Sequence, residues 1–546
     1  MTAAPAIVLV GYGPVGARFV EDLLPAVRAG AVSLTVIGAE DEEAYNRVLV
    51  AEYAVGRTDR SAMEVTDTGA ALAAGVRFVR ARRVTGVDRD GSTVNLDDGS
   101  TLGYDRLVFA TGARANVPTL DGIDVVSRDL RALLRLDHAE QGRDQRLPSG
   151  VTVLRDLADA RTVRDAVAGG RRIVVLGAGV LGLEIALAAA EAGAEVCVVH
   201  HGGYPMARNL DTGGGTVLAR SVVRAGVALV AHSRAEAVVY RTDDGGERHF
   251  DALVCADGKV IAGDLLVLSC GVSARAELAT LAGLPTSAGI LVDHGLRSWG
   301  DPHVFAIGDC AHVAGRPADY LAGARVPGGP TGLIGPGWRQ AEWLAASLSS
   351  EFAATPSPEP LAAPRPALVM LKSEAVDVVS VGDVDLEPWD TEPPTVSETG
   401  EHVPGRQVSQ WVDPEHGRYL KMVTRRGVLE GMVCVGLPRT AAELTLLFER
   451  GSELPADRSV LLRNDGPDYA PTTDSDAFAP DATVCWCNGV TVAHIHESVD
   501  AGDTTVACVG KSTRAGTGCG GCKGRIGELI ERFLEGEAIE AAVPGR

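Results

Sequence analysis

A glycine-rich turn occurs twice in the chain, each time directly after a short run of aliphatic residues. The first turn follows residues 7–10 and reads Gly11-Tyr12-Gly13-Pro14-Val15-Gly16, and the second follows residues 172–175 and reads Gly177-Ala178-Gly179-Val180-Leu181-Gly182. An amphipathic segment comes after each turn, so both stretches predict a strand, a turn and a helix. Glycines at this spacing permit a tight turn, close approach to a pyrophosphate and close helix–strand packing. We therefore expect an α/β protein that holds two dinucleotides on two Rossmann-like units.

The residues at the end of the next strand bear on which dinucleotide each unit takes. In the first unit, a strand over 33–37 ends near Glu40, whose carboxylate is suited to accept hydrogen bonds from a ribose. In the second unit, a strand over 195–199 ends at His200 and His201, which we interpret as solvated loop residues. No arginine cluster replaces the missing acid, so NADH is favoured and NADPH stays open.

Four cysteines late in the chain form two close pairs. Cys485 and Cys487 make a CxC motif, and Cys519 and Cys522 make a CxxC motif in a glycine-rich string. Four thiolates that converge on one point bind a metal ion or an iron–sulfur cluster. The CxC spacing is a poor match to ordinary zinc sites, but structural zinc remains the alternative.

Bulk composition narrows the function classes. A chain of 546 residues predicts three or four domains, and a net charge of −21 argues against nonspecific binding to nucleic acid or to an anionic membrane. No signal peptide and no apolar run long enough to span a bilayer are evident, so we expect a cytoplasmic, reducing compartment. The remaining cysteines in apolar or glycine-flanked segments are interpreted as buried small hydrophobes: Cys197, Cys255, Cys270, Cys310 and Cys434.

Two further strand ends complete a recognisable order of motifs. A strand ends in Thr111-Gly112 between the fingerprints, and another ends in Gly308-Asp309 after the second. This order resembles that of the two-dinucleotide-binding-domain flavoproteins, such as glutathione-reductase-like and rubredoxin-reductase-like enzymes. The resemblance implies FAD on Gly11, Gly13, Gly16, Glu40, Thr111, Gly112, Gly308 and Asp309. It implies a nicotinamide nucleotide on Gly177, Gly179, Gly182 and Glu184.

Two shorter motifs narrow the resemblance. Tyr45-Asn46-Arg47 resembles the flavin-contacting turn of the large subunit of NADH-dependent nitrite reductases, which adds Asn46 and Arg47 to the residues implied for FAD. The cysteine pairs resemble the [2Fe–2S] module of the bacterioferritin-associated ferredoxin (BFD) type, which implies Cys485, Cys487, Cys519 and Cys522 as ligands. With no sirohaem motif in sight, the chain resembles the front half of that large subunit, as found in the electron-transfer subunit of assimilatory nitrate reductases.

The same resemblance divides the chain into domains. We expect an FAD-binding domain from 1–120 and 252–350, and an NAD(P)H-binding domain over 121–251. A small α+β interface domain follows over 365–450. A linker over 464–480 then leads to a small helical BFD-like [2Fe–2S] domain over 481–540. The segment 126–150 looks like an insertion to which we assign no role.

The cysteines also constrain the chemistry. None occurs before Cys197, so the dithiol of a disulfide reductase and the single cysteine of a flavin peroxidase are both missing beside the flavin. We expect an NADH-dependent oxidoreductase that passes electrons through FAD and the [2Fe–2S] cluster to a separate terminal reductase, with no catalytic side chain of its own.

The resemblance favours the catalytic subunit of a molybdenum nitrate reductase as the partner, and then a nitrite reductase. A basic face on Lys511, Arg514, Lys523 and Arg525 is the expected docking surface for that partner. A reductase for a soluble rubredoxin or ferredoxin, and a zinc-containing flavoprotein sensor or scaffold, are the alternatives.

Overall fold

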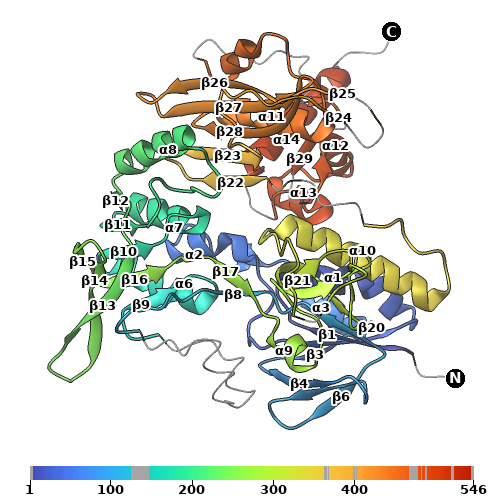
Figure 1. Ribbon diagram of the computed structural model, residues 1–546. Coiled ribbons are helices and arrows are strands. Elements are labelled where there is room, and N and C mark those ends of the chain that lie inside the picture. Colours follow the sequence, from blue (N-terminus) through green and yellow to red (C-terminus); the bar gives the residue numbers. More distant parts are fainter. Residues whose placement is uncertain are drawn as a thin grey trace.

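The computed structural model of the chain describes residues 4–123, 147–321, 323–361, 366, 368–396, 400, 402–466, 478–480, 482–485, 488–517 and 522–542. Two units built on parallel sheets lie side by side, with an antiparallel sheet over one and a helical module over the other (Figure 1). The predicted insertion lies outside the described residues except for 147–150, and so does most of the predicted linker. In these ranges no helix is both long enough and apolar enough to cross a bilayer.

The first unit is organised around β1, the strand that precedes the first glycine-rich turn. Its residues 7–10 are aliphatic and buried, as expected for a strand covered on both faces. β1 pairs in parallel with both β2 and β7, and helices α1 (Pro14–Arg28) and α10 (Ile334–Ala353) pack against each other and the same core. The eight-stranded sheet has the order β21 (Ala311–Val313), β18 (Ile290–Val292), β19 (Arg297–Ser298), β20 (Asp301–Ala306), β7 (Arg106–Phe109), β1 (Ala6–Val10), β2 (Ser33–Ile37) and β3 (Arg77–Val79).

Smaller elements complete the first unit. A three-stranded antiparallel meander lies below the main sheet in Figure 1 and consists of β4 (Val84–Asp88), β5 (Thr93–Leu96) and β6 (Thr101–Gly103). The short helices are η1 (Arg47–Leu49), α2 (Val50–Ala54), η2 (Ser61–Met63), α3 (Thr68–Ala73), α9 (Glu277–Leu281) and η3 (Gly308–Cys310). Residues 45–63 pack on the core of the second unit, so this segment reaches across between the two.

The second unit repeats the design on a five-stranded parallel sheet. Its order is β12 (Ala228–Val230), β11 (Val196–Val199), β10 (Ile173–Leu176), β16 (Leu265–Leu268) and β9 (Val151–Val153). The associated helices are α6 (Leu157–Ala168), α7 (Val180–Glu191) and α8 (Thr212–Arg224). An antiparallel sheet projects from this unit and contains β13 (Ala235–Thr242), β14 (Arg248–Cys255) and β15 (Val260–Ala262) (Figure 1).

The pairing of β16 corrects one predicted domain limit. We expected residues from 252 onward to return to the first unit, but β16 lies between β10 and β9 in the second sheet. The chain returns only after it, through β17 (Val272–Ala274), which pairs with β8 (Ala113–Ala115) where the chain first crosses. The prediction failed because the sequence of a short aliphatic strand does not indicate which of two sheets the strand will join.

The C-terminal unit is an antiparallel sheet that packs on the second unit. Its order is β22 (Val369–Lys372), β23 (Asp377–Gly382), β28 (Val428–Val435), β27 (Arg418–Arg425) and β26 (Gln407–Asp413). Residues of this sheet share one core with α7 and α8. The other elements are the pair β24 (Thr395–Val396) and β25 (His402–Val403), the helix α11 (Pro438–Arg450) and η4 (Arg458–Asp465).

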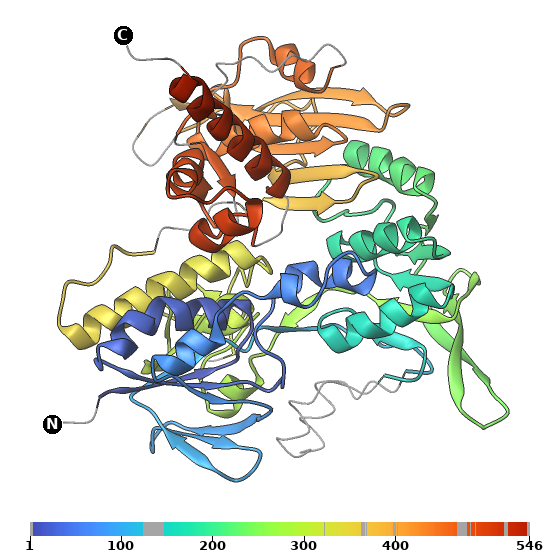
Figure 2. The ribbon, with the colours of Figure 1, turned by 180° about the vertical axis from the view of Figure 1, so that it is seen from behind.

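The described residues from 478 onward form a separate helical unit, which we call the cluster module. It contains β29 (Thr483–Cys485), β30 (Val490–Thr491), α12 (Val492–Asp500), α13 (Val506–Thr513) and α14 (Lys523–Ala542). Ile495, Val509 and Ile526 are fully buried in a core of its own. The module lies above α10 and the first unit in both views (Figures 1 and 2). The predicted α/β class, with two Rossmann-like units, a small α+β unit and a small helical unit, is confirmed.

Candidate functional site

A cavity of about 1210 Å³ lies between the two Rossmann-like units. The ends of β1, β2 and β7 open onto it from the first unit, and Leu181 and Glu184 of α7 line it from the second. Predicted cofactor residues in its lining are Gly11, Gly13, Glu40, Arg47, Thr111, Gly112, Gly308, Asp309 and Glu184. Gly16, Asn46, Gly177, Gly179 and Gly182 lie outside that lining.

The first fingerprint has the geometry of a diphosphate cradle. Gly11 has a φ of +112°, and a Cβ there would overlap the carbonyl oxygen of Ala110. A Cβ at Gly16 would overlap the carbonyl oxygen of Gly11, so both positions need glycine to bring turn and strand together. Gly13 is the N-cap of α1 and has no side chain to cap the helix. The first-turn N–H groups are therefore left to an anion, which is what a pyrophosphate requires.

The second fingerprint repeats this geometry. Gly177 has a φ of +117°, and a Cβ on it would overlap the carbonyl oxygen of Ser269, while one on Gly182 would overlap that of Gly177. Gly179 is the N-cap of α7, and a Cβ on it would meet no protein atom within 4 Å. The open space faces the start of a helix whose N–H groups are uncapped, so this site also fits a diphosphate.

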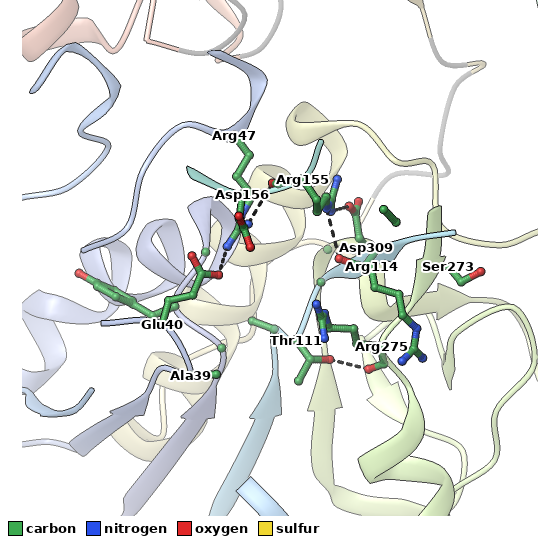
Figure 3. Close-up of a pocket in the computed structure, with 18 of the residues that line it drawn as sticks. Ala39, Glu40, Arg47, Thr111, Arg114, Arg155, Asp156, Ser273, Arg275 and Asp309 are labelled. Carbon is green, nitrogen blue, oxygen red and sulfur yellow. Dashed lines mark hydrogen bonds and ion pairs between the residues drawn. The ribbon is translucent and has the colours of Figure 1, made fainter. Parts of the chain in front are cut away.

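Glu40 and Arg47 lie together at one end of the cavity. Arg47 forms an ion pair with Glu40 (Figure 3). The Tyr45 hydroxyl donates to the same carboxylate at 3.1 Å. Arg47 also donates to the carbonyl oxygen of Arg155 at 3.2 Å. Glu40, expected to accept from a ribose, is therefore already oriented by two donors from the Tyr45–Arg47 turn.

Arg155 is a cavity residue that the sequence did not reveal. It follows β9 in the second unit, and its guanidinium binds Asp309 at 2.9 Å and the carbonyl oxygen of Ala113 at 3.2 Å (Figure 3). Asp309 is thus oriented by an arginine from the opposite unit. The only local signal is the Asp156–Asp159 capping box that starts α6 beside it, and this box predicts a helix start and no ligand contact.

The other predicted strand ends also lie on the cavity wall. The Thr111 hydroxyl donates to the carbonyl oxygen of Arg275 at 2.7 Å (Figure 3). Gly308 has a φ of +72°, and its N–H donates to the side chain of Gln340 in α10 at 2.8 Å. Leu333 and Ile334 place the N-terminus of α10 on the same wall. Further arginines in the lining that sequence reasoning missed are Arg82, Arg83, Arg114 and Arg275.

The histidines that end β11 differ from their predicted setting. His201 is exposed as expected, but His200 is buried, so its interpretation as a solvated loop residue is wrong. Burial lowers the pKa of His200 to about 4, and the neighbouring His201 and His232 act in the same direction. His200 is therefore uncharged at neutral pH.

The described cysteines of the cluster module are suited to ligate iron. Cys485 ends β29 and is 2% exposed, and Cys522 directly precedes α14, while Cys487 and Cys519 lie outside the described residues. A hydrogen bond from the Cys522 thiol lowers the pKa of Cys485 to about 6, aided by backbone N–H groups of Gly516 and Asn488. Thiolates surrounded by N–H donors are the ligands that an iron–sulfur cluster requires, so the site fits the group.

The isolated cysteines have the opposite chemistry. Cys255, Cys310 and Cys434 are buried, and burial raises the pKa of each thiol. Cys197 and Cys270 are half-buried, and burial raises the pKa of both to about 11. These thiols are protonated at neutral pH and poor nucleophiles, in line with their interpretation as small hydrophobes. Among the described lining residues of the cavity there is no cysteine.

Comparison with known proteins finds relatives over nearly the whole chain. It is 29% identical over 541 residues to the nitrite reductase [NAD(P)H] large subunit of Klebsiella oxytoca, which covers 98% of this chain and 50% of that protein. It is 25% identical over 540 residues to the assimilatory nitrate reductase electron transfer subunit of Bacillus subtilis, which covers 98% of this chain and 61% of that protein. The chain therefore spans about half to three-fifths of the length of these relatives.

Solved structures share the fold at lower identity. The putidaredoxin reductase–putidaredoxin complex aligns with a TM-score of 0.63 and 19% identity, over 84% of this chain and 96% of that one. NADH:rubredoxin oxidoreductase from Clostridium acetobutylicum aligns with a TM-score of 0.59 and 17% identity, over 85% of this chain and all of that one. The predicted glutathione-reductase-like arrangement of the two units is confirmed by these structures.

Two family models match the chain. The pyridine nucleotide-disulphide oxidoreductase model matches residues 5–326, and the BFD-like [2Fe-2S] binding domain model matches residues 483–532. The cofactors are accordingly FAD, a nicotinamide nucleotide and a [2Fe–2S] cluster, as the motifs predicted. The chain belongs to the pyridine nucleotide-disulphide oxidoreductase family, and it carries a BFD-like [2Fe–2S] binding domain in addition.

Proposed function

We propose that this chain takes electrons from NADH and passes them through FAD and the [2Fe–2S] cluster to a separate terminal reductase. The observation that carries the proposal is the setting of the cavity. Both dinucleotide units line it, its described lining holds no cysteine, and the cluster module contacts the first unit. The described cavity wall therefore provides no thiol that could relay electrons. The cluster module is the redox group that contacts the first unit. When bound, FAD accepts a hydride and releases single electrons, which matches a two-electron donor to a one-electron cluster.

The chain's own residues have binding and orienting roles in this proposal. The uncapped helix starts at Gly13 and Gly179 bind the two diphosphates. Glu40, held by Arg47, accepts from the adenosine ribose of FAD, and Asp309, held by Arg155, accepts from the ribityl chain. Glu184, in the second turn of α7, lines the cavity wall on the side of the nicotinamide nucleotide.

NADH is the proposed donor because residues 200–203, which follow β11, include no arginine or lysine. A 2′-phosphate needs a positive partner there, and His200 is neutral at physiological pH. We expect kcat/KM for NADH to exceed that for NADPH by about tenfold or more, a ratio equivalent to about 1.4 kcal/mol. Steady-state dye reduction with each nucleotide measures this, and equal values would contradict the assignment.

The proposed acceptor is the catalytic subunit of a molybdenum nitrate reductase, with a nitrite reductase next. Support comes from the Bacillus subtilis relative, which is named an electron transfer subunit for nitrate reductase and of which this chain spans a larger share than of the Klebsiella oxytoca protein. We propose that the partnership operates in the cytoplasm, where NADH is regenerated.

Anaerobic reconstitution tests the proposal. The chain with NADH should bleach its flavin, reduce its cluster and reduce one-electron dyes, yet leave nitrate and nitrite unreduced. Addition of a cognate molybdenum nitrate reductase subunit should start NADH-dependent nitrate reduction. Nitrate or nitrite reduction by the chain alone, zinc in place of iron, or an unreduced cluster would each refute the relay.

A ferredoxin or rubredoxin reductase is the second candidate. It is favoured by the biphenyl dioxygenase system ferredoxin–NAD(+) reductase component of Paraburkholderia xenovorans, which is 28% identical over 305 residues. In that case a soluble ferredoxin or rubredoxin would be reduced rapidly by the chain alone. Loss of the module's cluster would then leave that rate unchanged, whereas the first proposal requires the cluster for transfer to its partner.

A further inference from the structure

The side chain of Asn46 joins the first unit to the cluster module. Asn46 is 1% exposed, and its Nδ2 donates to the carbonyl oxygen of Thr517 at 2.6 Å. Its Oδ1 accepts from the backbone N–H of Val48 at 3.0 Å, which fixes the amide orientation. Arg47 and Val48, the next two residues, line the cavity. One buried amide therefore spans from the cavity wall to the module.

A second contact joins the same two bodies. Arg514 of the module forms an ion pair with Glu21 of α1 at 2.6 Å, and both side chains are at least two-thirds buried. Glu21 lies on the helix whose N-terminus opens onto the cavity. Arg514 was expected in a basic face for an external partner, and the structure instead directs it to a carboxylate of this chain.

The turn from Arg514 to Thr517 is internally braced. Arg514 has a φ of +64°, a left-handed conformation that a non-glycine residue keeps only where its surroundings hold it. Its carbonyl oxygen accepts from Asn488 Nδ2 at 2.6 Å and from the Thr517 hydroxyl at 2.8 Å. The turn thus presents the Arg514 guanidinium and the Thr517 carbonyl to the first unit as one rigid piece.

This turn is also tied to the cluster ligands. Thr517 precedes Cys519 by two residues in the sequence. Asn488, which braces the turn, lies with its Nδ2 3.6 Å from the sulfur of Cys485. The contacts of the turn with the first unit therefore influence how Cys485 is placed relative to the cavity.

We propose that the turn Arg514–Thr517 is the docking element that seats the cluster module on the first unit, and that Asn46 is the positioning residue that aligns this turn with the cavity wall. This inference rests on the proposed electron relay and names the contacts through which it runs. The described path runs from Arg47 or Val48 at the wall through the Asn46 side chain to the turn, and from the turn through Asn488 to the sulfur of Cys485.

A charge swap tests the docking element. Arg514→Glu and Glu21→Arg each place like charges together, and the double variant restores the pair with reversed signs. The holoprotein is studied at pH 8, above the value of about 7 to which burial raises the pKa of Glu21. Lys511→Glu is the matched control, because Lys511 is an exposed base in α13, the helix that ends directly before Arg514.

Two readouts are followed in each variant. Hydrogen exchange of peptides covering 14–28 and 43–50 reports docking without any turnover, and stopped-flow with freeze-quench EPR separates flavin reduction from cluster reduction. We expect each single variant to raise exchange in these peptides and to slow cluster reduction about tenfold, as loss of a coupling of about 1.4 kcal/mol would. The double variant should recover both readouts, and Lys511→Glu should change neither.

Asn46→Asp tests the positioning role separately. An aspartate retains the Oδ1 contact to Val48 but removes the donor to Thr517 and sets two oxygens against each other. We expect Asn46→Asp to slow cluster reduction with no loss of bound FAD. In Asn46→Gln, the rate of cluster reduction should return toward the wild-type value only if the longer amide still reaches Thr517. Loss of FAD on Asn46→Asp would instead assign this residue to the flavin and overturn its positioning role.

The outcomes separate the two levels of inference. If wild-type protein shows no NADH-dependent reduction of its cluster, the proposed function fails. If wild type relays electrons but the Arg514 and Glu21 variants exchange and transfer like wild type, the docking inference alone is refuted. Glu21→Gln guards against a folding artefact, because it removes the ion pair from outside the module and should shift both readouts in the same direction.

Discussion

At the scale of single residues, the glycines of one fingerprint have different tasks. Gly177 has positive φ and no room for a Cβ, so the fold itself requires glycine there. Gly179 has ordinary backbone angles and open space around it, so only an incoming ligand requires its small size. The same motif therefore contains one position that serves stability and one that serves binding.

Substitution at these two positions should separate stability from affinity. Gly177→Ala should lower the free energy of unfolding by about 3 kcal/mol or more, from left-handed strain and overlap with Ser269. Gly179→Val should leave the melting temperature nearly unchanged but raise the Kd for NADH about tenfold, because its side chain occupies the diphosphate's place. Thermal melts and nucleotide titrations measure the two effects, and equal destabilisation by both variants would contradict the distinction.

Asp264 and Arg172 give a residue-level pH dependence. Hydrogen bonds and charge from Arg172 lower the pKa of Asp264 to about 2, where the carboxylate ties the start of β16 to that of β10. A depressed carboxyl pKa contributes stability above the unfolded value near 4, and the contribution is lost as pH falls from about 4 toward 2. Because Arg172 is substantially exposed, solvent screening limits the pair to about 0.5–1 kcal/mol.

Asp264→Asn should show this in its melting temperature. The variant should melt below wild type at pH 7, and the gap should narrow as the pH is lowered from 5 to 3. A gap that stays constant over this range would mean that the carboxylate charge is not the source of the stabilisation.

At the scale of elements, a buried polar group holds α8 against β27. Lys421 of β27 is fully buried, and its ammonium lies 3.0 Å from Asp211, which caps α8 through the N–H of Gly214. The Tyr419 hydroxyl donates to the same carboxylate and accepts from Gln410 at 2.7 Å. A Cβ at Gly213 would crowd the Tyr419 ring, so the first turn of α8 needs glycine at this position to approach the sheet. One aspartate thus caps a helix and neutralises a buried lysine of the neighbouring unit.

Removal of that carboxylate should be far more harmful than removal of the lysine charge. Asp211→Ala leaves a buried ammonium without its anion and should lower the free energy of unfolding by about 3–5 kcal/mol. Lys421→Met removes the charge and should cost less than half of that. Glu387→Gln is the control, since this partner of Lys421 lies 3.5 Å away and is 37% exposed. Denaturant unfolding ranks the three, and similar values for all would exclude a buried ion pair as the cause.

At the scale of the whole molecule, the cofactor regions belong to separate hydrophobic cores. The first unit has one core, the second unit shares another with the C-terminal unit, and the cluster module has its own. The described contacts Asn46–Thr517 and Glu21–Arg514 between module and first unit are polar. Folding of the dinucleotide units is therefore independent of whether the module holds its cluster.

Loss of a ligand cysteine should accordingly affect one cofactor only. Cys485→Ser or Cys522→Ser should abolish bound iron and acid-labile sulfide while about one FAD per chain remains. Cys508→Ser, an exposed cysteine of the same module, should retain both cofactors. Iron and sulfide assays with flavin absorption decide this, and FAD loss in the ligand variants would show that the units depend on each other.

The sequence by itself determined those features of this protein that depend only on residues next to one another in the chain. Each strand–turn–helix follows from an aliphatic run and glycines at set spacing, because positive φ and close backbone approach are local demands. The ligand cysteines follow in the same way from the chemistry of paired thiols. Arg155, the sheet that β16 joins and the burial of His200 carried no such signal, since each depends on which segment packs nearby.

Only the tertiary structure decided how the parts meet. Asn46 and Thr517 are 471 residues apart, and the sequence of neither segment predicts a contact with the other. Their contact exists because α1 and the Tyr45–Arg47 turn form one surface and the braced Arg514 turn forms another, and the partners of buried polar groups are settled when such surfaces pack. For the same reason Glu40, Arg47 and Asp309 were identified by motif, while Arg155, the arginine that orients Asp309, came from packing alone.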